Sequence, residues 1–333
     1  MKMTVGFNGD LDLIPKLAKY PVDSIFTKMT KDILGGGRSS FILGQIDMDH
    51  IKKVVKTAND HNIKMIYLLN SACQSNFELT RSYNNELVEF IGDLHKIGVR
   101  HVVVATPYML DLVKQNFPDI HVSVSVFAII DNAHKAKFWE ERGADCLIIA
   151  PNINRNFDEI KRIRAAVNCE LEIFTNVTCL YQCPYAQFHA NAVSHASTSK
   201  DKNKGFVIDY NVTNCSINKL TSPVEMIKGR WIRPEDISYY EELGIDLFKI
   251  ADRQKPSDWM LNTVKAYGEQ SYDGNLVDLL PFPMIKGSKT DFEISNHAKT
   301  LLKPKHVNIE VLKRYRDKEN VYVNIDNKNW KDF

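Results

Sequence analysis

The chain has 333 residues, of which 44% are hydrophobic and 25% are charged, a composition typical of soluble folded proteins. This excludes disorder and coiled coil as the main architecture. The 43 Lys and Arg residues nearly balance the 41 Asp and Glu residues, so the formal charge of +2 does not indicate nucleic-acid binding by itself, although a local basic groove is compatible with it. Because no signal-peptide core and no run of about 18 apolar residues occurs, we expect a cytoplasmic protein that does not cross a membrane.

From the N-terminus to about Arg253, short β-rich runs alternate with amphipathic segments, the pattern of βα units around a parallel sheet. The expected strands are Thr4–Phe7, Asp23–Thr27, Ile63–Asn70, Val99–Thr106, His121–Phe127, Asp145–Ala150, Glu170–Asn176 and Ile245–Ile250. The expected helices include Asp47–Asp60, Asn84–Lys96, Asn132–Arg142, Asp158–Ala166 and Pro234–Leu243, several of which open with a capping Asp or Asn or with Pro. Gly98, Gly143 and Gly244 each follow a helix, where a left-handed C-cap favours glycine. Eight strands in this order predict a closed (βα)8 barrel of the TIM type.

The alternation is interrupted between residues 177 and 233, a stretch too long for an ordinary βα connection. We interpret it as an insertion after the seventh strand, and hence on the face where (βα)8 enzymes place their chemistry. The barrel, with this insertion, is expected to span residues 1–270. Residues 271–333 read as polar loops with a possible helix near His306–Arg316 and a short strand near Val321–Ile325, and we expect them to form a C-terminal extension packed on the barrel.

Three of the six cysteines, Cys179, Cys183 and Cys215, lie in the insertion. Six cysteines in a chain inferred to be cytoplasmic do not indicate a disulfide framework. Thiolates in this arrangement can occupy three positions of an iron–sulfur cluster or provide the soft ligands of zinc. The alternative is that they are buried cysteines without a metal, because free cysteine is among the most buried residue types.

The sequence leaves the fourth ligand open. Cys73 follows the third strand on the same face of the barrel and could reach a shared site, whereas Cys169 precedes the seventh strand, about 20 Å away at 3.3 Å per residue. Cys146 lies within a hydrophobic strand and reads as structural. The other possibilities are His189 or His195, in a helix after Cys183, or no protein ligand, which would leave one iron open to substrate.

Strand alternation places Glu172 and Asn176 on the face of the seventh strand that points into the barrel, and Lys249 and Arg253 share a face of the eighth. A buried glutamate needs a partner, so Lys249 or Arg253 is expected either to pair with Glu172 in a structural ion pair or to bind an anionic substrate. The segment 35–38, Gly-Gly-Gly-Arg, reads either as a flexible loop or as an anion-binding loop, and it lacks the ending of a P-loop.

From about Val22 to Arg253 the sequence resembles the collagenase-like peptidases of family U-32, whose catalytic type is unassigned. The match is carried by residues 171–179, Leu-Glu-Ile-Phe-Thr-Asn-Val-Thr-Cys, which are similar to the family pattern Leu-Glu-Val-Phe-Val-His-Gly-Ala-Leu-Cys. Further similarity lies in Gly37-Arg38, in Asn132 with Phe138-Trp139 and Gly143-Ala144, and in residues 249–253, Lys-Ile-Ala-Asp-Arg, which resemble the signature Lys-Ile-Glu-Gly-Arg. The resemblance implies a (βα)8-type barrel and, as in several members, a cysteine-bound [4Fe–4S] cluster.

The sequence departs from the family pattern at several positions. Asn176 stands where the family has histidine, Ala251 stands where it has an acid, and Cys183 replaces a second cysteine that usually lies six residues beyond the first. The segment from Pro234 to Ile237 lacks the last cysteine of cluster-binding members, so either Cys73 compensates or three thiolates hold the cluster. Glu172, Cys179, Cys215, Lys249 and Arg253 carry over by resemblance, and Cys183 by spacing alone.

The leading hypothesis is therefore a [4Fe–4S]-dependent enzyme that modifies a small molecule, a peptide or an RNA base. Hydroxylation without molecular oxygen is what cluster-bearing relatives suggest, and an open iron would alternatively act as a Lewis acid. The expected catalytic residues are Glu172, Lys249, Arg253 and Asn176. A hydrolase with Glu172 as general base is the first alternative. The second is a non-catalytic subunit of a heteromeric complex, and a partner protein or a homo-oligomer is compatible with either.

Overall fold

In the computed structural model of the protein, residues 1–37, 45–198, 210–222 and 224–281 are described. Within them, eight parallel strands close into a barrel in which each strand pairs with the next along the chain and the last pairs with the first. The strands are β1 (Met3–Gly6), β2 (Val22–Thr27), β3 (Lys64–Leu69), β4 (His101–Val104), β5 (His121–Val124), β6 (Cys146–Ile148), β7 (Glu170–Phe174) and β8 (Leu247–Ile250). The predicted (βα)8 architecture and all eight predicted strands are confirmed.

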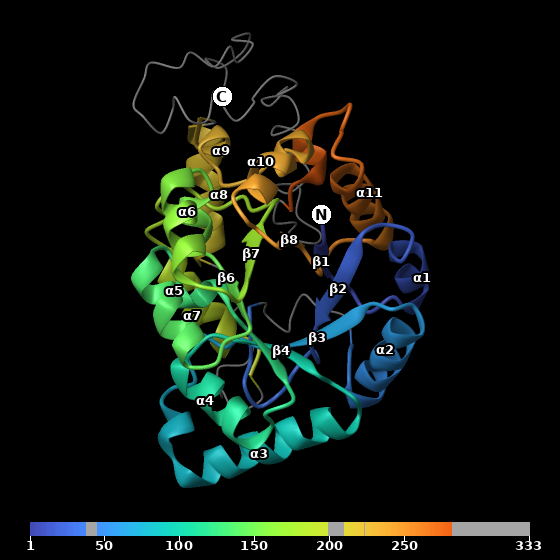
Figure 1. Ribbon diagram of the computed structural model, residues 1–333, viewed down its shortest axis with the longest axis vertical. Coiled ribbons are helices and arrows are strands. Elements are labelled where there is room, and N and C mark those ends of the chain that lie inside the picture. The colour runs from blue at the N-terminus through green and yellow to red at the C-terminus, as the bar shows by residue number, and fades with distance from the viewer. Residues whose placement is uncertain (38–44, 199–209, 223, 282–333) are drawn as a thin grey trace.

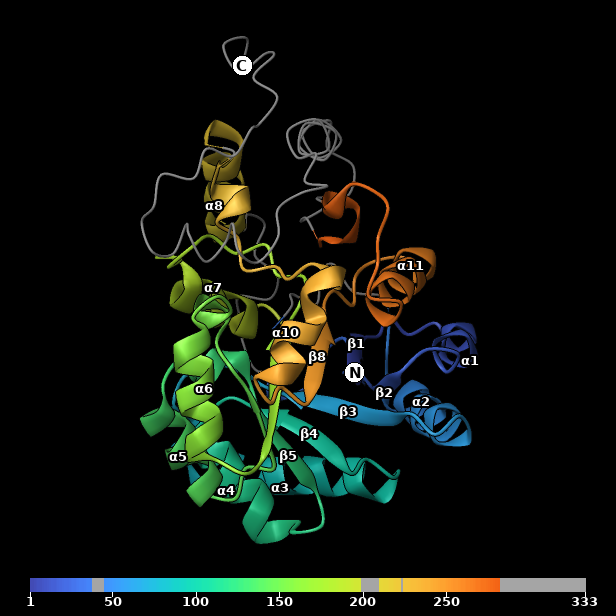
Figure 2. The same cartoon turned by 45° about the horizontal axis from the view of Figure 1, so that its top comes forward.

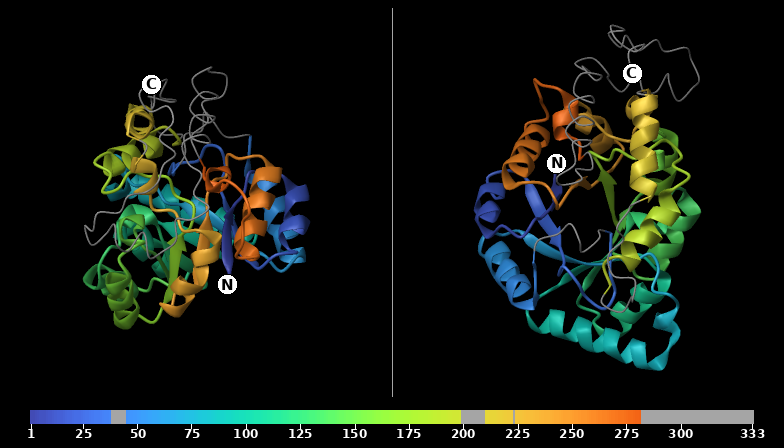
Figure 3. Two further views of the ribbon diagram at one scale, coloured as in Figure 1. Left: turned by 90° about the horizontal axis from the view of Figure 1, so that it is seen from above. Right: turned by 180° about the vertical axis from the view of Figure 1, so that it is seen from behind.

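Helices surround the barrel, and those that directly connect one strand to the next follow one another in chain order around it (Figures 1 and 3). They are α1 (Ile14–Leu17), α2 (Met48–Asp60), α3 (Arg81–Lys96), α4 (Pro107–Asn116), α5 (Ala133–Glu141), α6 (Phe157–Ala166), α7 (Ala186–His195), α8 (Tyr210–Thr221), α9 (Val224–Ile227), α10 (Ile237–Glu242) and α11 (Ser257–Gly268). None of the helices in the described part of the chain has the length and apolarity needed to cross a bilayer.

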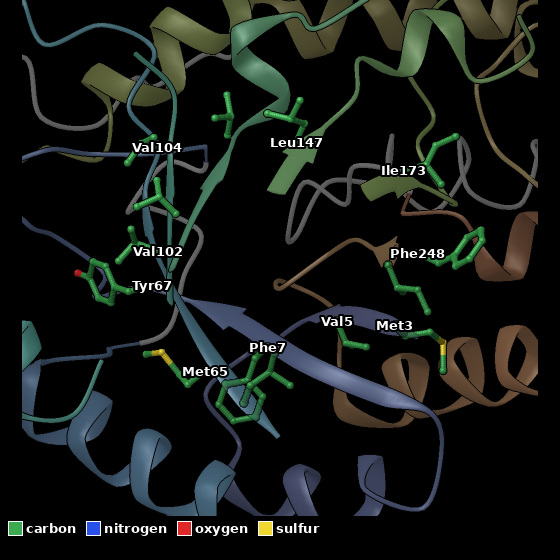
Figure 4. Close-up of a cluster of buried hydrophobic side chains, with 14 of the residues drawn as sticks. Met3, Val5, Phe7, Met65, Tyr67, Val102, Val104, Leu147, Ile173 and Phe248 are labelled. Carbon is green, nitrogen blue, oxygen red and sulfur yellow. The ribbon is translucent and has the colours of Figure 1, made fainter. Parts of the chain in front are cut away.

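Alternation along the strands divides the buried side chains into two layers. One set, including Met3, Val5, Tyr67 and Phe248, packs between the strands and the surrounding helices (Figure 4). The residues between them in sequence point into the barrel, where a second cluster is formed by Phe26, Ile66, Leu68, Val103 and Ile148. Residues on the two faces of a strand alternate with period two, so this division follows directly from the sequence.

The insertion between residues 177 and 233 carries helices α7, α8 and α9, which lie on the side of the barrel opposite α1 and α2 (Figure 2). Its return to the barrel is anchored by the Ile232 N–H, which donates to the carbonyl of Thr175 at 2.6 Å. Next to this bond, Trp231 is buried and its ring lies 4.8 Å from the guanidinium carbon of Arg155. The base of the insertion is therefore held by the main barrel.

Three glycines end helices in the way the sequence predicts. Gly98, Gly143 and Gly244 have φ angles of +98°, +96° and +82°. This left-handed conformation disfavours residues with a Cβ. The expected helix near His306–Arg316 and strand near Val321–Ile325 lie outside the described residues.

Candidate active site at the carboxyl ends of the strands

The barrel interior contains a buried ion pair. The Lys249 Nζ on β8 lies 2.9 Å from Glu172 Oε2 on β7, and both side chains are at most 5% exposed. The rings of Phe26 and Phe174 lie 4.3 and 5.7 Å from the same ammonium group. A charge in an apolar interior is tolerated when it is paired, and aromatic faces add a favourable interaction with the cation. Of the two partners that the sequence left open for Glu172, Lys249 forms the ion pair.

One oxygen of this pair remains available. Glu172 Oε1 has no hydrogen-bond partner among the described residues, although Oε2 accepts from Lys249. A carboxylate offers about four acceptor positions on its two oxygens. The pair can therefore accept a hydrogen bond from a substrate group that enters the barrel.

Asn176 and Arg253 lie just beyond the ends of β7 and β8. The Asn176 side chain is fully buried, and its Nδ2 donates to the carbonyls of Ala251 and Leu279 while its Oδ1 accepts from the Ala251 N–H. These bonds to the backbone connect the ends of the two strands. Arg253 is also buried, and its positive charge contributes to lowering the pKa of Lys28.

The insertion brings together the three cysteines that the sequence singles out. Cys179 is exposed and Cys183 is half-buried, both in the loop that leaves β7, and Cys215 is half-buried on α8. Burial raises the pKa of Cys183, and the charges of Cys179 and Cys215 act in the same direction. The three thiols are thus near enough for charge on one to affect the ionisation of another.

A buried cation lies beside them. Arg230 is 2% exposed, and its guanidinium carbon lies 4.1 Å from the centre of the Tyr181 ring. Burial lowers the pKa of Arg230 to about 10, while the nearby Tyr181, Cys179 and Cys183 act to raise it. Arg230 therefore remains charged at neutral pH and favours the thiolate form of these cysteines.

The three thiols form a donor set that suits a soft metal or an iron–sulfur cluster. In the described ranges, no group of three Cys, His, Asp or Glu side chains is arranged to hold a metal ion as it stands. The thiol chemistry fits the expected group, although these side chains are not arranged around a metal position.

The other cysteines occupy different surroundings. Cys73 lies in the loop after β3, where the N–H of the preceding Ala72 donates to Ser194 Oγ of α7 at 2.9 Å. Cys146 is buried within β6, and burial raises its pKa well above the usual value. Cys169 lies just before β7, where burial raises its pKa to about 12. The histidines considered as ligands, His189 and His195, are both on α7.

A second buried network went unpredicted. Lys28 Nζ, beyond the end of β2, donates to Asp32 Oδ1 at 2.9 Å and to the Gly35 carbonyl at 2.5 Å, and Tyr67 Oη donates to Asp32 Oδ2 at 2.8 Å. Burial lowers the pKa of Lys28, and the charge of Asp32 opposes this shift. In the sequence Lys28 lies two residues after Phe26, so strand alternation would have placed both side chains on the inner face of the barrel.

The glycine-rich segment after this network packs closely against α7. At Gly35, φ is +75°, and a Cβ would lie 2.2 Å from the carbonyl oxygen of Ser194. The Gly36 N–H donates to Ser197 Oγ at 2.8 Å. Glycine is thus required at position 35 for the contact between this loop and the insertion. Arg38 lies outside the described residues.

Comparison with known proteins places this architecture in one family. The family model described as peptidase family U32 matches residues 36–273. The chain belongs to peptidase family U32. An uncharacterized protease of Methanocaldococcus jannaschii is 34% identical over 252 residues, which cover 76% of this chain and 74% of that protein. The resemblance identified from the sequence is therefore confirmed.

Two further U32 comparisons are informative. The tRNA hydroxylation protein P1 of Bacillus subtilis is 22% identical over 272 residues, covering 78% of this chain and 60% of that protein. A solved structure of a U32 peptidase superposes with a TM-score of 0.58 at 23% identity, covering 77% of this chain and 95% of that one. The solved structure supports the fold.

Proposed function

We propose that this chain is an RNA-modifying enzyme that hydroxylates a nucleobase of a transfer RNA at the carboxyl ends of the barrel strands. The observation that carries the proposal is the grouping of Cys179, Cys183 and Cys215 beside buried Arg230, in the insertion that leaves β7. The similarity to tRNA hydroxylation protein P1 supports tRNA as the substrate and hydroxylation as the reaction.

In this proposal Cys179, Cys183 and Cys215 hold a [4Fe–4S] cluster, with zinc as the alternative. Cys73 or a group from the substrate completes the ligand set. When bound, the cluster supplies an electron carrier or an open Lewis-acidic iron. Arg230 stabilises the thiolate ligands by its charge.

The residues of the barrel bind and orient the base. The free Oε1 of Glu172 accepts a hydrogen bond from an amino or imino group, and Lys249 holds the carboxylate in place through Oε2. Hydroxylation replaces C–H by C–OH, which adds one oxygen atom and removes two electrons from the base. The reaction therefore needs either an oxygen-donating co-substrate that takes up those two electrons or water as the oxygen source with a separate two-electron acceptor.

Peptide hydrolysis is the alternative that the family description suggests. It would require Glu172 to act as a general base toward water. Glu172 Oε2 already accepts a hydrogen bond from Lys249 at 2.9 Å, so this oxygen is engaged in a buried ion pair. We favour nucleobase modification because of the similarity to tRNA hydroxylation protein P1.

The test is nucleoside mass spectrometry of total tRNA from cells with and without the gene. Cells that lack the gene should lose one nucleoside and accumulate its precursor, lighter by one oxygen atom. Identical nucleoside profiles in the two strains would contradict the proposed function. Release of peptides from a casein digest by the anaerobically purified protein would instead support the hydrolase.

A further inference from the structure

The insertion is more basic than the rest of the chain. Residues 177–233 contain seven Lys and Arg against three Asp and Glu, although the whole chain has a formal charge of only +2. The rest of the chain is therefore net acidic. Among the described basic residues, Lys219 and Arg230 are buried near the cysteine loop, where their charges act on Cys183 and its neighbours. A segment with excess positive charge is the electrostatic pattern expected where a phosphate backbone binds.

The insertion also carries exposed aromatic side chains. Tyr181, Phe188 and Tyr210 are 52%, 68% and 65% exposed. Tyr185 lies between two of them. Its ring lies 6.4 Å from that of Tyr210 in an edge-on contact. It also precedes Phe188 by three residues at the start of α7, so both side chains lie on the same side of that helix. Helices α7 and α8 contact each other, so the elements that carry these rings are neighbours.

The third ring, Tyr181, lies in the cysteine loop. Arg230 stacks on it at 4.1 Å, and the Nε and Nη2 of Arg230 have no hydrogen-bond partner within the described part of the chain. Arg230 is also the cation beside Cys179 and Cys183. Exposed rings and a buried cation with unused donors thus lie next to the proposed reaction centre.

We propose that Tyr181, Phe188 and Tyr210 form a stacking surface that binds unpaired bases of an RNA loop and holds the strand beside the cysteines. This inference rests on the proposed function, because it gives the RNA substrate a binding surface. Proteins that bind single-stranded nucleic acid combine aromatic side chains with a positively charged groove, since every base offers a face for stacking. Duplex RNA does not expose base faces, so the surface selects single strands.

The experiment measures binding of a fluorescently labelled oligouridine to the full-length protein by fluorescence anisotropy at fixed salt concentration. Phe188→Ala and Tyr210→Ala should each raise the dissociation constant about tenfold, within the range found for single stacking contacts. Phe188→Trp should retain binding, because it keeps a ring for stacking. The control Phe138→Ala removes an exposed ring on α5, outside the insertion, and should leave binding unchanged.

Each outcome decides the proposal. If wild-type protein binds oligouridine and the alanine variants bind equally well, the stacking surface is wrong while the proposed function stands. The same result is expected if the rings contact a partner protein instead. If the wild-type protein binds neither oligouridine nor tRNA, the proposed function fails together with the inference. Tighter binding of a duplex than of oligouridine would overturn the selection for single strands.

Discussion

At the scale of single residues, the buried pair of Glu172 and Lys249 is the feature most sensitive to substitution. Lys249→Met should lower the free energy of unfolding by about 3–5 kcal/mol, because it leaves a carboxylate unpaired among apolar side chains. The double variant Glu172→Gln/Lys249→Met should recover part of that loss, since no charge remains buried. Urea denaturation of the three proteins measures both effects. Equal stability of Lys249→Met and wild type would show that the pair is hydrated.

His101 provides a prediction about pH at the opposite end of the barrel. Burial, with smaller contributions from the charges of His121 and Lys64, lowers its pKa from 6.5 to about 4. Because the folded state binds the proton more weakly than the unfolded chain, the stability is fully present above pH 6.5 and is lost as the pH falls toward 4.

The loss that belongs to His101 should be about 2 kcal/mol once its partial exposure is considered. His101→Asn should therefore weaken the dependence of unfolding free energy on pH between 6.5 and 4. The exposed His134→Asn should leave that dependence unchanged. Denaturation curves at a series of pH values make the comparison, and parallel pH profiles for wild type and His101→Asn would contradict it.

At the scale of elements, alanine substitutions at two glycines six residues apart should change the stability of the protein in opposite directions. Gly92 lies within α3, and a Cβ there would make ordinary contacts at 3.7 Å with Phe117. Gly98 follows the same helix with φ of +98°, and its Cβ would approach Val55 to 3.2 Å. Gly92→Ala should stabilise the protein by about 1 kcal/mol and Gly98→Ala should destabilise it by at least about 1 kcal/mol. Thermal melts of both variants test the pair, and stabilisation by Gly98→Ala would contradict the C-cap assignment.

The strands could be predicted because each βα unit repeats one pattern, but their ends could not always be placed. The fourth strand was expected to reach Thr106, yet β4 ends at Val104 because Thr106 caps α4 with its side chain and Pro107 opens that helix. Helix α4 was not among the expected helices. Thr106 and Pro107 could have predicted the start of α4, because Thr is favoured at the N-cap and Pro at the first position of a helix.

The sequence did not predict which charged residues of the site would be buried. Strand alternation, a local property, placed Glu172 inside the barrel and left Lys249 and Arg253 as its two candidate partners. The positions of Arg230 beside the thiols and of Lys28 beside Asp32 depend on how distant segments pack, and a sequence does not distinguish a buried cation from an exposed one. The grouping of Cys215 with Cys183 likewise required α8 to pack on α7.

At the scale of the whole molecule, the proposed cysteine ligands Cys179, Cys183 and Cys215 are separate from the hydrophobic core. Single Ala substitutions at Cys179, Cys183 and Cys215 should each lower the iron bound per chain after anaerobic purification, whereas Cys169→Ala should not. Circular dichroism should show all four variants folded, because Cys179, Cys183 and Cys215 are not part of the main core and Cys169 packs against its edge while only partly buried. An unfolded Cys179→Ala protein would show that its loop is structural. Cys73→Ser tests the fourth ligand, and unchanged iron in that variant would favour three thiolates.

The central claim is that the chain hydroxylates a tRNA base in a reaction that depends on these three cysteines. The most direct measurement is the amount of the hydroxylated nucleoside in tRNA from cells lacking the gene that are complemented with variants. Wild type and Cys169→Ala should restore the nucleoside, and the triple variant Cys179→Ala/Cys183→Ala/Cys215→Ala should not. Restoration by the triple variant at the wild-type level, or no restoration by wild type, would contradict the account.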